Sequence, residues 1–375
     1  MKILLLGPAY PMRGGMVQFL SRLYRALIEA GHDTVFQRFI RQYPGFLFPG
    51  KTQMDESARP VKVESTPCLD PLNPLNWPVA AWRIARERPE LVVVNWWMPF
   101  FGPAYTVSLW LAKRLCGTKV MYLVHNAVPH EKRPGDMLIT RLGFSVADYF
   151  IVMSEAVKED LLSIRPDARY ALTPLPVFDI FGAPKDKPGA KSALGVDGPV
   201  ILFFGLVRAY KGLDILLDAM PGILDKVDAT LVVAGEFYED RAGFERQIGR
   251  LGISGRVKLL DRFIPDEEVG DIFSASDILV LPYRSATQSG ITQIAYVFGT
   301  PVIATDVGGL PEVVKDGVTG VIVPPGDPAA LSEAVVRFFE EGGPDRYRDN
   351  IEKEMKRFSW EVMVEVIERM ASDRG

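Results

Sequence analysis

The chain alternates short, continuous apolar runs with segments of helical periodicity, and this alternation is the feature that most limits its possible folds. Continuous apolar runs are typical of strands buried on both faces, as in parallel sheets covered by helices. Between Met16 and Ala30 the apolar residues follow a helical period that Gly31 closes. The predicted strands of this first series are 2–6, 34–39, 91–94, 119–124 and 149–152.

A second series begins after Phe181. The segment 182–198 is rich in Gly, Pro and Lys and lacks apolar periodicity, which predicts an interdomain linker. A helix is predicted at 213–220, and strands at 200–204, 230–234, 257–260, 277–281, 302–304 and 320–323. The sequence therefore predicts an α/β protein with two Rossmann-like domains, and a ligand cleft at the carboxyl ends of both sheets.

The composition of the chain limits the kind of protein and its cellular location further. The 375 residues suffice for two domains, and the net charge of −4 lacks the basic excess of a nucleic-acid-binding protein. Only Cys68 and Cys116 are present, which favours a reducing, cytoplasmic location. The apolar run at the start is too short for a signal peptide.

One stretch, 91–112, has no charged residue and is long enough to span a bilayer. Asn95, Pro99, Gly102 and Pro103 interrupt it. We therefore expect a strand, a loop and a short helix rather than a membrane span.

Glycines and cations follow the predicted strands at three places. Gly14-Gly15 opens the first helix, where backbone N–H groups can approach an anion or a hydroxyl-rich ligand. Arg208 and Lys211 follow Gly205 in the loop after strand 200–204, so both can face one diphosphate. Tight turns and solvated charges without a ligand are the alternatives.

The third place is the polar loop after strand 277–281, which leads through Ser289-Gly290 into a helix. The free N–H groups of that helix suit a phosphate. Gly299-Thr-Pro301 closes the helix, and Gly308-Gly309-Leu-Pro-Glu312 follows the next strand. An ordinary strand–loop–helix unit without ligand is the alternative.

With these motifs in order, the whole chain resembles the retaining glycosyltransferases of family 4, which have the GT-B fold. Further matching elements are His125-Asn126, Asp316-Gly-x-x-Gly320 and the tail Phe358-Ser-Trp360. The resemblance implies two Rossmann-like domains facing a central cleft. It implies an acceptor-binding domain at 1–181, joined by the C-terminal helix 359–375 crossing back, and a nucleotide-sugar donor domain at 182–358.

The resemblance also implies roles for single residues. Gly15 and Gly205 would let backbone approach the donor, and Arg208 and Lys211 would hold its diphosphate and stabilise the charge on the leaving group. Ser289 and Gly290 would offer N–H groups to the distal phosphate. His125, with Arg208 and Lys211, is the predicted catalytic set, through a hydrogen bond to the donor sugar or the reacting centre. The acceptor-side candidates are Arg13, Gly14, Asn95, His130 and Glu131.

The chain departs from the family pattern where two glutamates are expected. Counting back from Gly299 puts Ala286 and Ile294 at these positions, and a shift of one residue puts Gln293 at the second. The Gln293 amide can still bond a ribose hydroxyl. The missing glutamates also leave open a non-catalytic partner subunit, and a sugar-nucleotide epimerase of the same fold is a further alternative.

An insert at 38–51 places aromatic residues beside basic ones, and aromatics follow again at 96–101. These aromatics either line the acceptor side, stacking on a sugar or meeting a lipid-linked diphosphate at the membrane face, or pack under a long loop. We interpret both segments as lining the acceptor side. This implies a peripheral contact with the inner face of the membrane.

The implied reaction moves a sugar from a nucleotide-diphosphate sugar to a glycan or lipid-linked acceptor, with retention of anomeric configuration, in cell-surface polysaccharide or glycoconjugate synthesis. No Asp-x-Asp occurs in the chain. We therefore expect a metal-independent enzyme without a cofactor, whose partners are the nucleotide sugar and the acceptor, and no nucleic acid.

Overall fold

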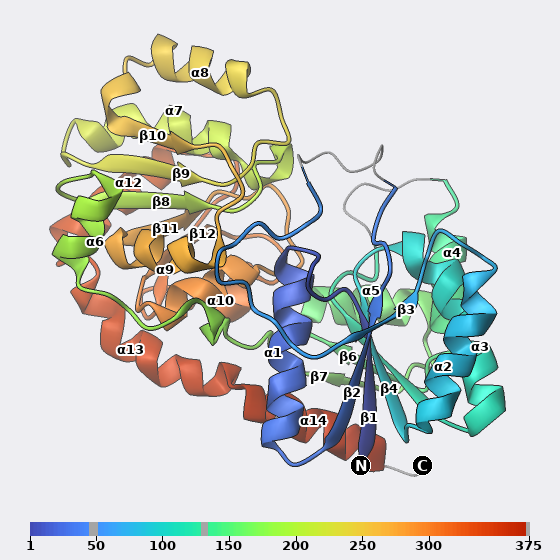
Figure 1. Cartoon of the computed structure of the whole chain (residues 1–375). Coiled ribbons are helices and arrows are strands. Elements are labelled where there is room, and N and C mark those ends of the chain that lie inside the picture. The colour runs from blue at the N-terminus through green and yellow to red at the C-terminus, as the bar shows by residue number, and fades with distance from the viewer. Residues whose placement is uncertain (45–51, 129–133, 373–375) are drawn as a thin grey trace. The chain divides into compact units, whose positions relative to one another are not determined.

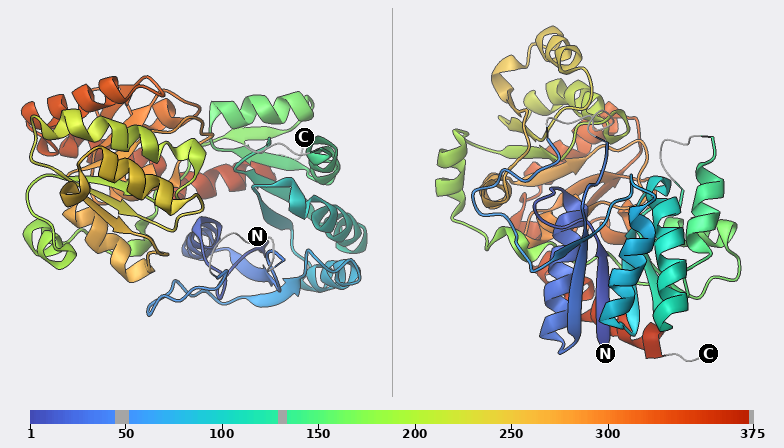
Figure 2. Two further views of the ribbon diagram at one scale, coloured as in Figure 1. Left: turned by 90° about the horizontal axis from the view of Figure 1, so that it is seen from above. Right: turned by 45° about the vertical axis from the view of Figure 1, so that its right-hand side comes forward.

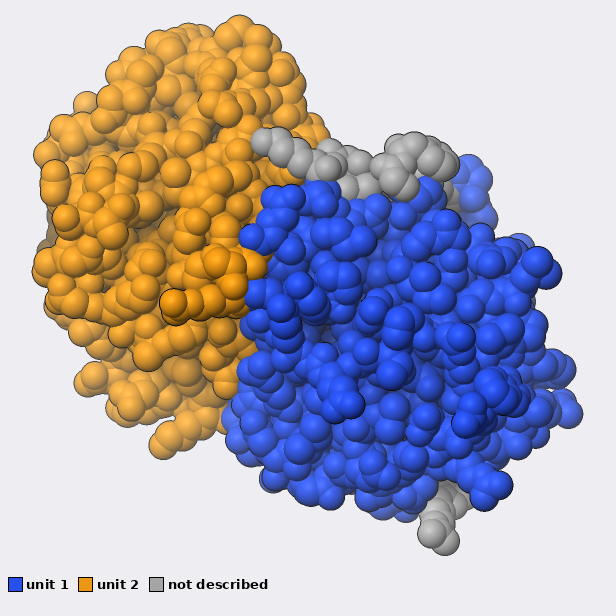
Figure 3. All heavy atoms as spheres, viewed as in Figure 1, with its two compact units in different colours: residues 1–56, 60–176, 359–375 blue, residues 57–59, 177–358 orange. Residues whose placement is uncertain are grey.

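The computed structural model of the chain describes residues 1–44, 52–128 and 134–372 (Figure 1). The chain divides into two compact units, which Figure 3 shows in two colours. Unit 1 comprises residues 1–56, 60–176 and 359–375, and unit 2 comprises residues 57–59 and 177–358.

The first break falls before Val177, whereas the sequence places it at Phe181. The Val177 N–H donates to the Phe358 carbonyl oxygen at 2.9 Å. The 3₁₀ helix η3 (Asp179–Phe181) contacts helix α9 (Asp266–Ala275). Residues 177–181 therefore belong to unit 2 by their contacts.

Unit 1 is built on a seven-stranded sheet of order β3-β2-β1-β4-β5-β6-β7, in which all neighbouring strands are parallel. Its strands are β1 (Lys2–Gly7), β2 (Asp33–Phe39), β3 (Thr66–Leu69), β4 (Leu91–Trp96), β5 (Lys119–Val124), β6 (Tyr149–Val152) and β7 (Tyr170–Leu172). The predicted strands are confirmed. The edge strands β3 and β7 are missed because they are short and partly exposed.

Helices cover both faces of this sheet (Figures 1 and 2). Helices α2 (Asn76–Glu87), α3 (Gly102–Cys116) and α4 (Asp136–Phe144) cover one face, and α5 (Glu155–Ile164) joins the same hydrophobic core. Helix α1 (Gly15–Glu29) and the last helix, α14 (Trp360–Ser372), contact each other.

The C-terminal helix packs on unit 1, as predicted. Trp360 is buried with its ring 5.3 Å from that of Phe19, and His32 Nε2 lies 2.9 Å from Glu368 Oε1.

The uncharged stretch 91–112 forms β4, a 3₁₀ helix η2 (Pro99–Phe101) and the first part of α3. Within the described residues, the structure contains no helix with the length and apolar character that crossing a membrane requires. The expected strand, loop and helix are confirmed, although α3 is longer than predicted.

Unit 2 is built on a six-stranded parallel sheet of order β10-β9-β8-β11-β12-β13. Its strands are β8 (Val200–Phe204), β9 (Thr230–Ala234), β10 (Val257–Leu260), β11 (Ile278–Leu281), β12 (Val302–Thr305) and β13 (Gly320–Val323). Its helices are α6 (Lys187–Leu194), α7 (Leu213–Leu224), α8 (Arg241–Arg250), α9, α10 (Gly290–Val297), α11 (Leu310–Val313), α12 (Pro328–Glu340) and α13 (Asp345–Met355). The strand order reverses at β8, where parallel α/β sheets bind ligands beyond the strand ends.

The predicted linker at 182–198 is wrong, because the segment contains α6. Asp186 caps this helix by accepting from the Gly189 N–H at 2.9 Å, and Gly195 ends it in a left-handed conformation. Lys187 and Lys191 each lie 2.7 Å from the Asp277 carboxylate. Contacts between these lysines and a buried acid do not require a run of apolar residues. The apolar periodicity of the sequence therefore does not reveal α6.

Candidate functional site

The loop after β8 begins with Gly205, whose φ of +100° favours glycine. A Cβ at this position would lie 3.0 Å from Lys211 Nζ and 3.5 Å from Ile291 Cδ1. A side chain here would press on the ammonium and would be strained by the positive φ. The glycine lets Lys211 fold back over the end of β8, beside the start of α10.

Gly212 holds the same loop against the neighbouring strand. It follows the 3₁₀ helix η4 (Ala209–Lys211) with a φ of +67°. A Cβ at Gly212 would lie 2.0 Å from the Pro282 carbonyl oxygen. The backbone thus approaches the end of β11 at a distance that only glycine permits.

The two predicted cations lie close to each other. Lys211 Nζ lies 5.6 Å from the centre of the Tyr283 ring, and the Arg208 guanidinium lies 5.0 Å from that of Tyr238. Burial, with the positive charge of Arg208, lowers the pKa of Lys211 to about 8. Within the described residues no carboxylate or hydrogen-bond acceptor pairs with the Lys211 ammonium, so its charge is available to an anion.

An ion pair that the sequence does not predict holds the cationic loop in place. Arg284 Nη1 and Nη2 bond the two carboxylate oxygens of Asp214 at 2.9 and 2.5 Å. Arg284 Nη1 also donates to the Ala209 carbonyl oxygen at 2.7 Å, and its backbone N–H donates to that of Tyr210 at 2.7 Å. The bidentate pair fixes η4 to the loop after β11.

The loop after β9 supports the other side of the cationic loop. The Val207 N–H donates to the Glu236 carbonyl oxygen at 3.0 Å, and the Tyr238 N–H donates to that of Val207 at 3.1 Å. The Ala209 N–H donates to Glu239 Oε1 at 3.0 Å. The charged residues after β9 therefore shape this site, although the sequence interpretation does not include them.

The start of α10 lies beside the same loop. Its first residue is Gly290, and Ser289 makes no side-chain bond to the helix N–H groups. The Ser289 side chain instead hydrogen-bonds Tyr283, whose pKa is raised by burial. The first N–H groups of this helix therefore have no side-chain cap and can receive an anion.

Gly308 and Gly309 shape the polar loop that precedes α10. A Cβ at Gly308, where φ is +51°, would lie 1.5 Å from the Ala286 carbonyl oxygen. The Gly309 N–H donates to the Thr287 carbonyl oxygen at 3.2 Å. The double glycine thus lets two loops touch through their backbones.

Gln293 is fully buried in α10, two residues beyond Ile291. Within the described part of the chain, neither its Oε1 nor its Nε2 has a hydrogen-bond partner. A buried amide without partners is costly, so the ligand hydroxyl predicted for Gln293 would supply what the protein lacks.

In unit 1 the Gly14-Gly15 turn is open. Gly14 has a φ of +110°, and a Cβ on either glycine would have no atom within 4 Å. No side chain caps α1, while the Arg13 N–H donates to the Gln53 carbonyl oxygen at 3.1 Å. Backbone N–H groups at this helix start are therefore accessible to a ligand.

Asn95 and His125 lie at the ends of β4 and β5, near α1. Asn95 is fully buried, with Nδ2 3.8 Å from Met16 Sδ; no described residue bonds its Oδ1. The His125 ring meets that of Phe19 edge-on at 5.0 Å. Burial lowers the His125 pKa to about 3, so the imidazole is neutral. His130 and Glu131 lie outside the described residues.

The aromatic segments do not line a site in the way the sequence interpretation expects. Phe39, Trp96 and Phe101 are fully buried in the core of unit 1. Trp97 Nε1 donates to the Tyr43 hydroxyl at 3.0 Å. These aromatics pack against one another, and the part of the insert at 45–51 lies outside the described residues.

The structure therefore brings the donor-site candidates of unit 2 together: Gly205, Arg208, Lys211, Ser289, Gly290 and, on the same helix, Gln293. It brings Gly14, Gly15, Asn95 and His125 to the carboxyl edge of the sheet in unit 1. Their roles stay predictions. Within the described residues no group of three or more His, Cys, Asp or Glu is placed to hold a metal ion.

Two family models match the chain. Residues 198–341 match the model described as Glycosyl transferases group 1, and residues 14–176 match that of the Glycosyl transferase 4-like domain. A D-inositol 3-phosphate glycosyltransferase of Corynebacterium diphtheriae is 28% identical over 242 residues, covering 60% of this chain and 56% of the relative. One from Mycobacterium leprae is 34% identical over 188 residues, covering 47% and 42%. The chain spans about half the length of the curated relatives it matches.

Solved structures resemble the fold over nearly the whole chain. The sucrose-phosphate synthase of Thermosynechococcus elongatus has a TM-score of 0.73 at 20% identity, covering 99% of this chain and 98% of its own. Anabaena HepE in complex with UDP has a TM-score of 0.72 at 20% identity, with the same coverage. With one family model on each sheet and this likeness in fold, the chain belongs to the family 4 glycosyltransferases of the GT-B fold, the glycosyl transferases group 1.

Proposed function

We propose that the protein is a retaining glycosyltransferase that takes its sugar from a nucleoside diphosphate sugar bound at the carboxyl edge of the sheet in unit 2. One observation carries this proposal. Lys211 is held over Gly205 beside Arg208, yet no described residue supplies an anion to it. A diphosphate at this place would supply the missing charge.

The cations would act most strongly on the departing group. As the bond between the sugar and the diphosphate breaks, negative charge accumulates on the phosphate oxygens. Lys211 and Arg208 would neutralise it, and the N–H groups at Gly290 and Ile291 would bind the distal phosphate. Because Lys211 and Arg208 would already neutralise the diphosphate, we propose that the reaction needs no metal.

The acceptor side is assigned to unit 1. A neutral His125 can donate one hydrogen bond to a sugar hydroxyl and cannot repel a developing cationic centre. Gly15 would admit the donor, and Arg13, Gly14 and Asn95 would meet a glycan or lipid-linked acceptor. Retention, with the leaving diphosphate taking the acceptor proton on the same face, follows from the family resemblance.

The relatives suggest which donors to test first. HepE was solved with UDP-glucose, and two other relatives are named as a sucrose-phosphate synthase and a D-inositol 3-phosphate glycosyltransferase. We therefore propose a hexosyl donor with UDP as the first nucleotide to test, and a role in cell-surface polysaccharide or glycoconjugate synthesis.

A panel of nucleotide sugars tests the proposal. The cognate donor should raise the Tm because it binds the native state, and turnover with an acceptor should continue in excess EDTA. Loss of turnover in EDTA that magnesium or manganese restores would contradict the metal-free mechanism. A panel without any Tm increase would contradict the donor site.

Ala286 and Ile294, at the positions of the family glutamates, favour a second candidate, a non-catalytic partner subunit. Slow hydrolysis of the donor without acceptor separates the two. An enzyme should release nucleoside diphosphate in a Lys211-dependent manner, whereas a binding subunit should show the Tm increase and release none.

A further inference from the structure

Large apolar side chains are exposed on one side of unit 1. Of the 14 exposed large hydrophobic residues in the described part of the chain, eight lie on or next to α2, α3 and α4. They are Leu75, Val79, Trp82, Trp110, Leu115, Met137, Leu138 and Leu142. Exposed tryptophan is unusual on a soluble surface, and here Trp82 is 53% and Trp110 is 50% exposed.

These residues belong to one surface. Helix α3 contacts both α2 and α4, and the three helices lie side by side on one face of the sheet (Figures 1 and 2). The inner sides of these helices face the core with Ala81, Ile84 and Leu109. Since Leu75, Val79 and Trp82 follow a helical spacing on the opposite side of α2, they point outward. We name the eight residues, together with Arg86, Arg114 and Arg141, the α2–α4 surface.

Cations are interleaved with the apolar residues. The Arg86 guanidinium lies 4.9 Å from the centre of the Trp82 ring, and that of Arg114 lies 5.2 Å from the Trp110 ring. Between residues 72 and 118 there are five basic and two acidic residues, although acids outnumber bases in the whole chain. One of the two acids, Glu87, is paired with Lys2 at 3.3 Å.

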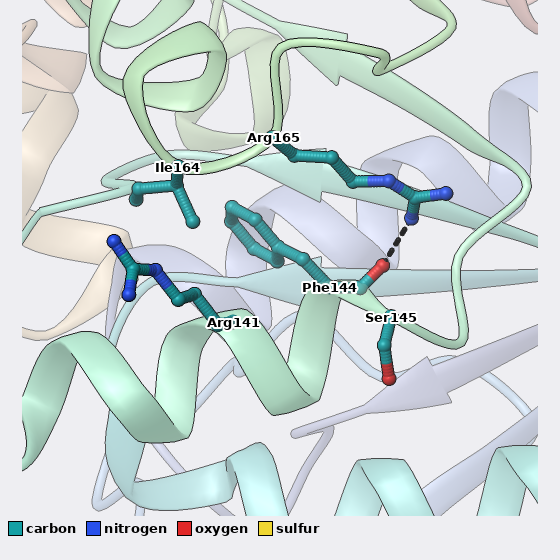
Figure 4. Close-up of a pocket in the computed structure, with 5 residues that line it drawn as sticks. All are labelled: Arg141, Phe144, Ser145, Ile164 and Arg165. Atoms are coloured by element: carbon teal, nitrogen blue, oxygen red, sulfur yellow. Dashed lines mark hydrogen bonds between the residues drawn. The ribbon is translucent and has the colours of Figure 1, made fainter.

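A cavity of about 260 Å³ opens beside α4, between the ends of α4 and α5 (Figure 4). Phe144 lies between Arg141 and Arg165 in this view. Arg165 is engaged by the Phe144 and Ala147 carbonyl oxygens. No described residue hydrogen-bonds or pairs with the Arg141 guanidinium. Arg141 therefore adds a cation without a partner to the α2–α4 surface.

We propose that the α2–α4 surface docks the protein on an anionic phospholipid bilayer. Tryptophan and leucine side chains would enter the interface between headgroups and acyl chains, and the arginines would meet lipid phosphates. A second copy of the chain fits this surface poorly. A symmetric dimer would bring two surfaces with the same positive charge together, and they would repel each other. The surface differs from the aromatic insert in which the sequence predicts a membrane contact.

Vesicle cosedimentation tests the proposal without any activity readout. The full chain should bind vesicles of phosphatidylcholine mixed with phosphatidylglycerol, and bind vesicles of phosphatidylcholine alone much less. Binding should weaken as salt rises from about 0.1 M to about 1 M, because the Debye length falls from ~10 to ~3 Å. Tryptophan fluorescence should shift to the blue on binding.

Paired variants identify the surface. Trp82→Ala with Trp110→Ala should weaken binding by roughly tenfold or more and remove the fluorescence shift. Arg86→Glu with Arg114→Glu should abolish the preference for anionic lipid. The matched controls lie elsewhere: Ile28→Ser with Val318→Ser changes two exposed apolar residues, and Arg246→Glu with Arg250→Glu changes two exposed arginines. Both controls should bind like the wild type.

Three outcomes would overturn the proposal. The wild type does not bind anionic vesicles at low salt; or the control variants lose binding as much as the surface variants do; or light scattering finds a dimer that the tryptophan variants dissociate. Circular dichroism of each variant shows that it is folded, which these exposed positions allow.

Discussion

Gln293 offers a test in which stability and ligand binding should move in opposite directions. Both polar atoms of its amide are buried without a partner in the described part of the chain. Replacing Gln293 by Met keeps most of the side-chain volume and removes both polar atoms. If the amide is kept for a ribose hydroxyl, Gln293→Met should stabilise the ligand-free protein and weaken its affinity for the nucleotide.

The size of each effect follows from the burial. An unsatisfied buried polar group costs about 1–3 kcal/mol. Taking about 2 kcal/mol, and a shift of about 2–4 °C per kcal/mol for a domain of this size, the Tm of the ligand-free variant should rise by roughly 4–8 °C. Losing one neutral hydrogen bond of about 0.5–1.5 kcal/mol should weaken nucleotide binding by up to roughly tenfold.

Differential scanning calorimetry with and without UDP gives both numbers in one series. Thr292→Val is the matched control, because Thr292 is its neighbour in α10 and its buried hydroxyl also has no described partner. This control should raise the Tm without changing the shift that UDP produces. Pyrophosphate, which has no ribose, should stabilise wild type and Gln293→Met equally. A lower Tm for Gln293→Met, or an unchanged affinity for UDP, would refute the reasoning.

Three further predictions concern the cationic loop. Lys211→Ala should lower kcat by roughly a hundredfold with a smaller change in KM, because the contact strengthens as the leaving group gains charge; wild-type turnover in this variant would exclude Lys211 as the clamp. Since the folded pKa of Lys211 is about 8 against an ordinary 10.5, its charge is lost as pH rises through 8, so kcat/KM should fall above that pH in the wild type and stay level in Lys211→Arg. Asp214→Asn should raise the donor KM several-fold, yet change the free energy of unfolding by less than about 1 kcal/mol because the pair is half exposed; equal losses of stability and binding would indicate a merely structural pair.

The sheets could be predicted because a buried parallel strand is specified locally. Strands β5, β8 and β9 begin and end at the predicted residues, since each consists almost entirely of apolar residues and is followed by polar or glycine residues. Helix α6 could not, because the contacts of Lys187 and Lys191 are made with Asp277, which is distant in sequence. Long-range ion pairs leave no periodic pattern.

The candidate site also contains some residues that the sequence predicts and others that only the fold reveals. Gly205, Lys211 and Gly212 can be identified from the sequence, because they directly follow the predicted strand 200–204. The ion pair that holds this loop cannot be identified in the same way. Arg284 and Asp214 are far apart in the sequence, and only the fold brings them together. The interpretation of Trp96 and Phe101 as lining the acceptor side is wrong for a related reason, since both are fully buried. Composition shows that a segment is aromatic, but only packing shows which way it faces.

The glycines of unit 2 explain how the residues of the proposed donor site come together at this edge of the sheet. Gly212 and Gly308 each place a backbone carbonyl where a Cβ would be, at Pro282 and Ala286. These contacts draw the loops after β8, β11 and β12 together, so that charges on different loops share one region. Tight packing of the loops leaves Lys211 only partly exposed and Gln293 fully buried. This burial lowers the lysine pKa and leaves the amide without a described partner. If the proposed nucleotide sugar binds here, its phosphates and ribose hydroxyls would supply the partners that Lys211 and Gln293 lack, and this would make binding favourable.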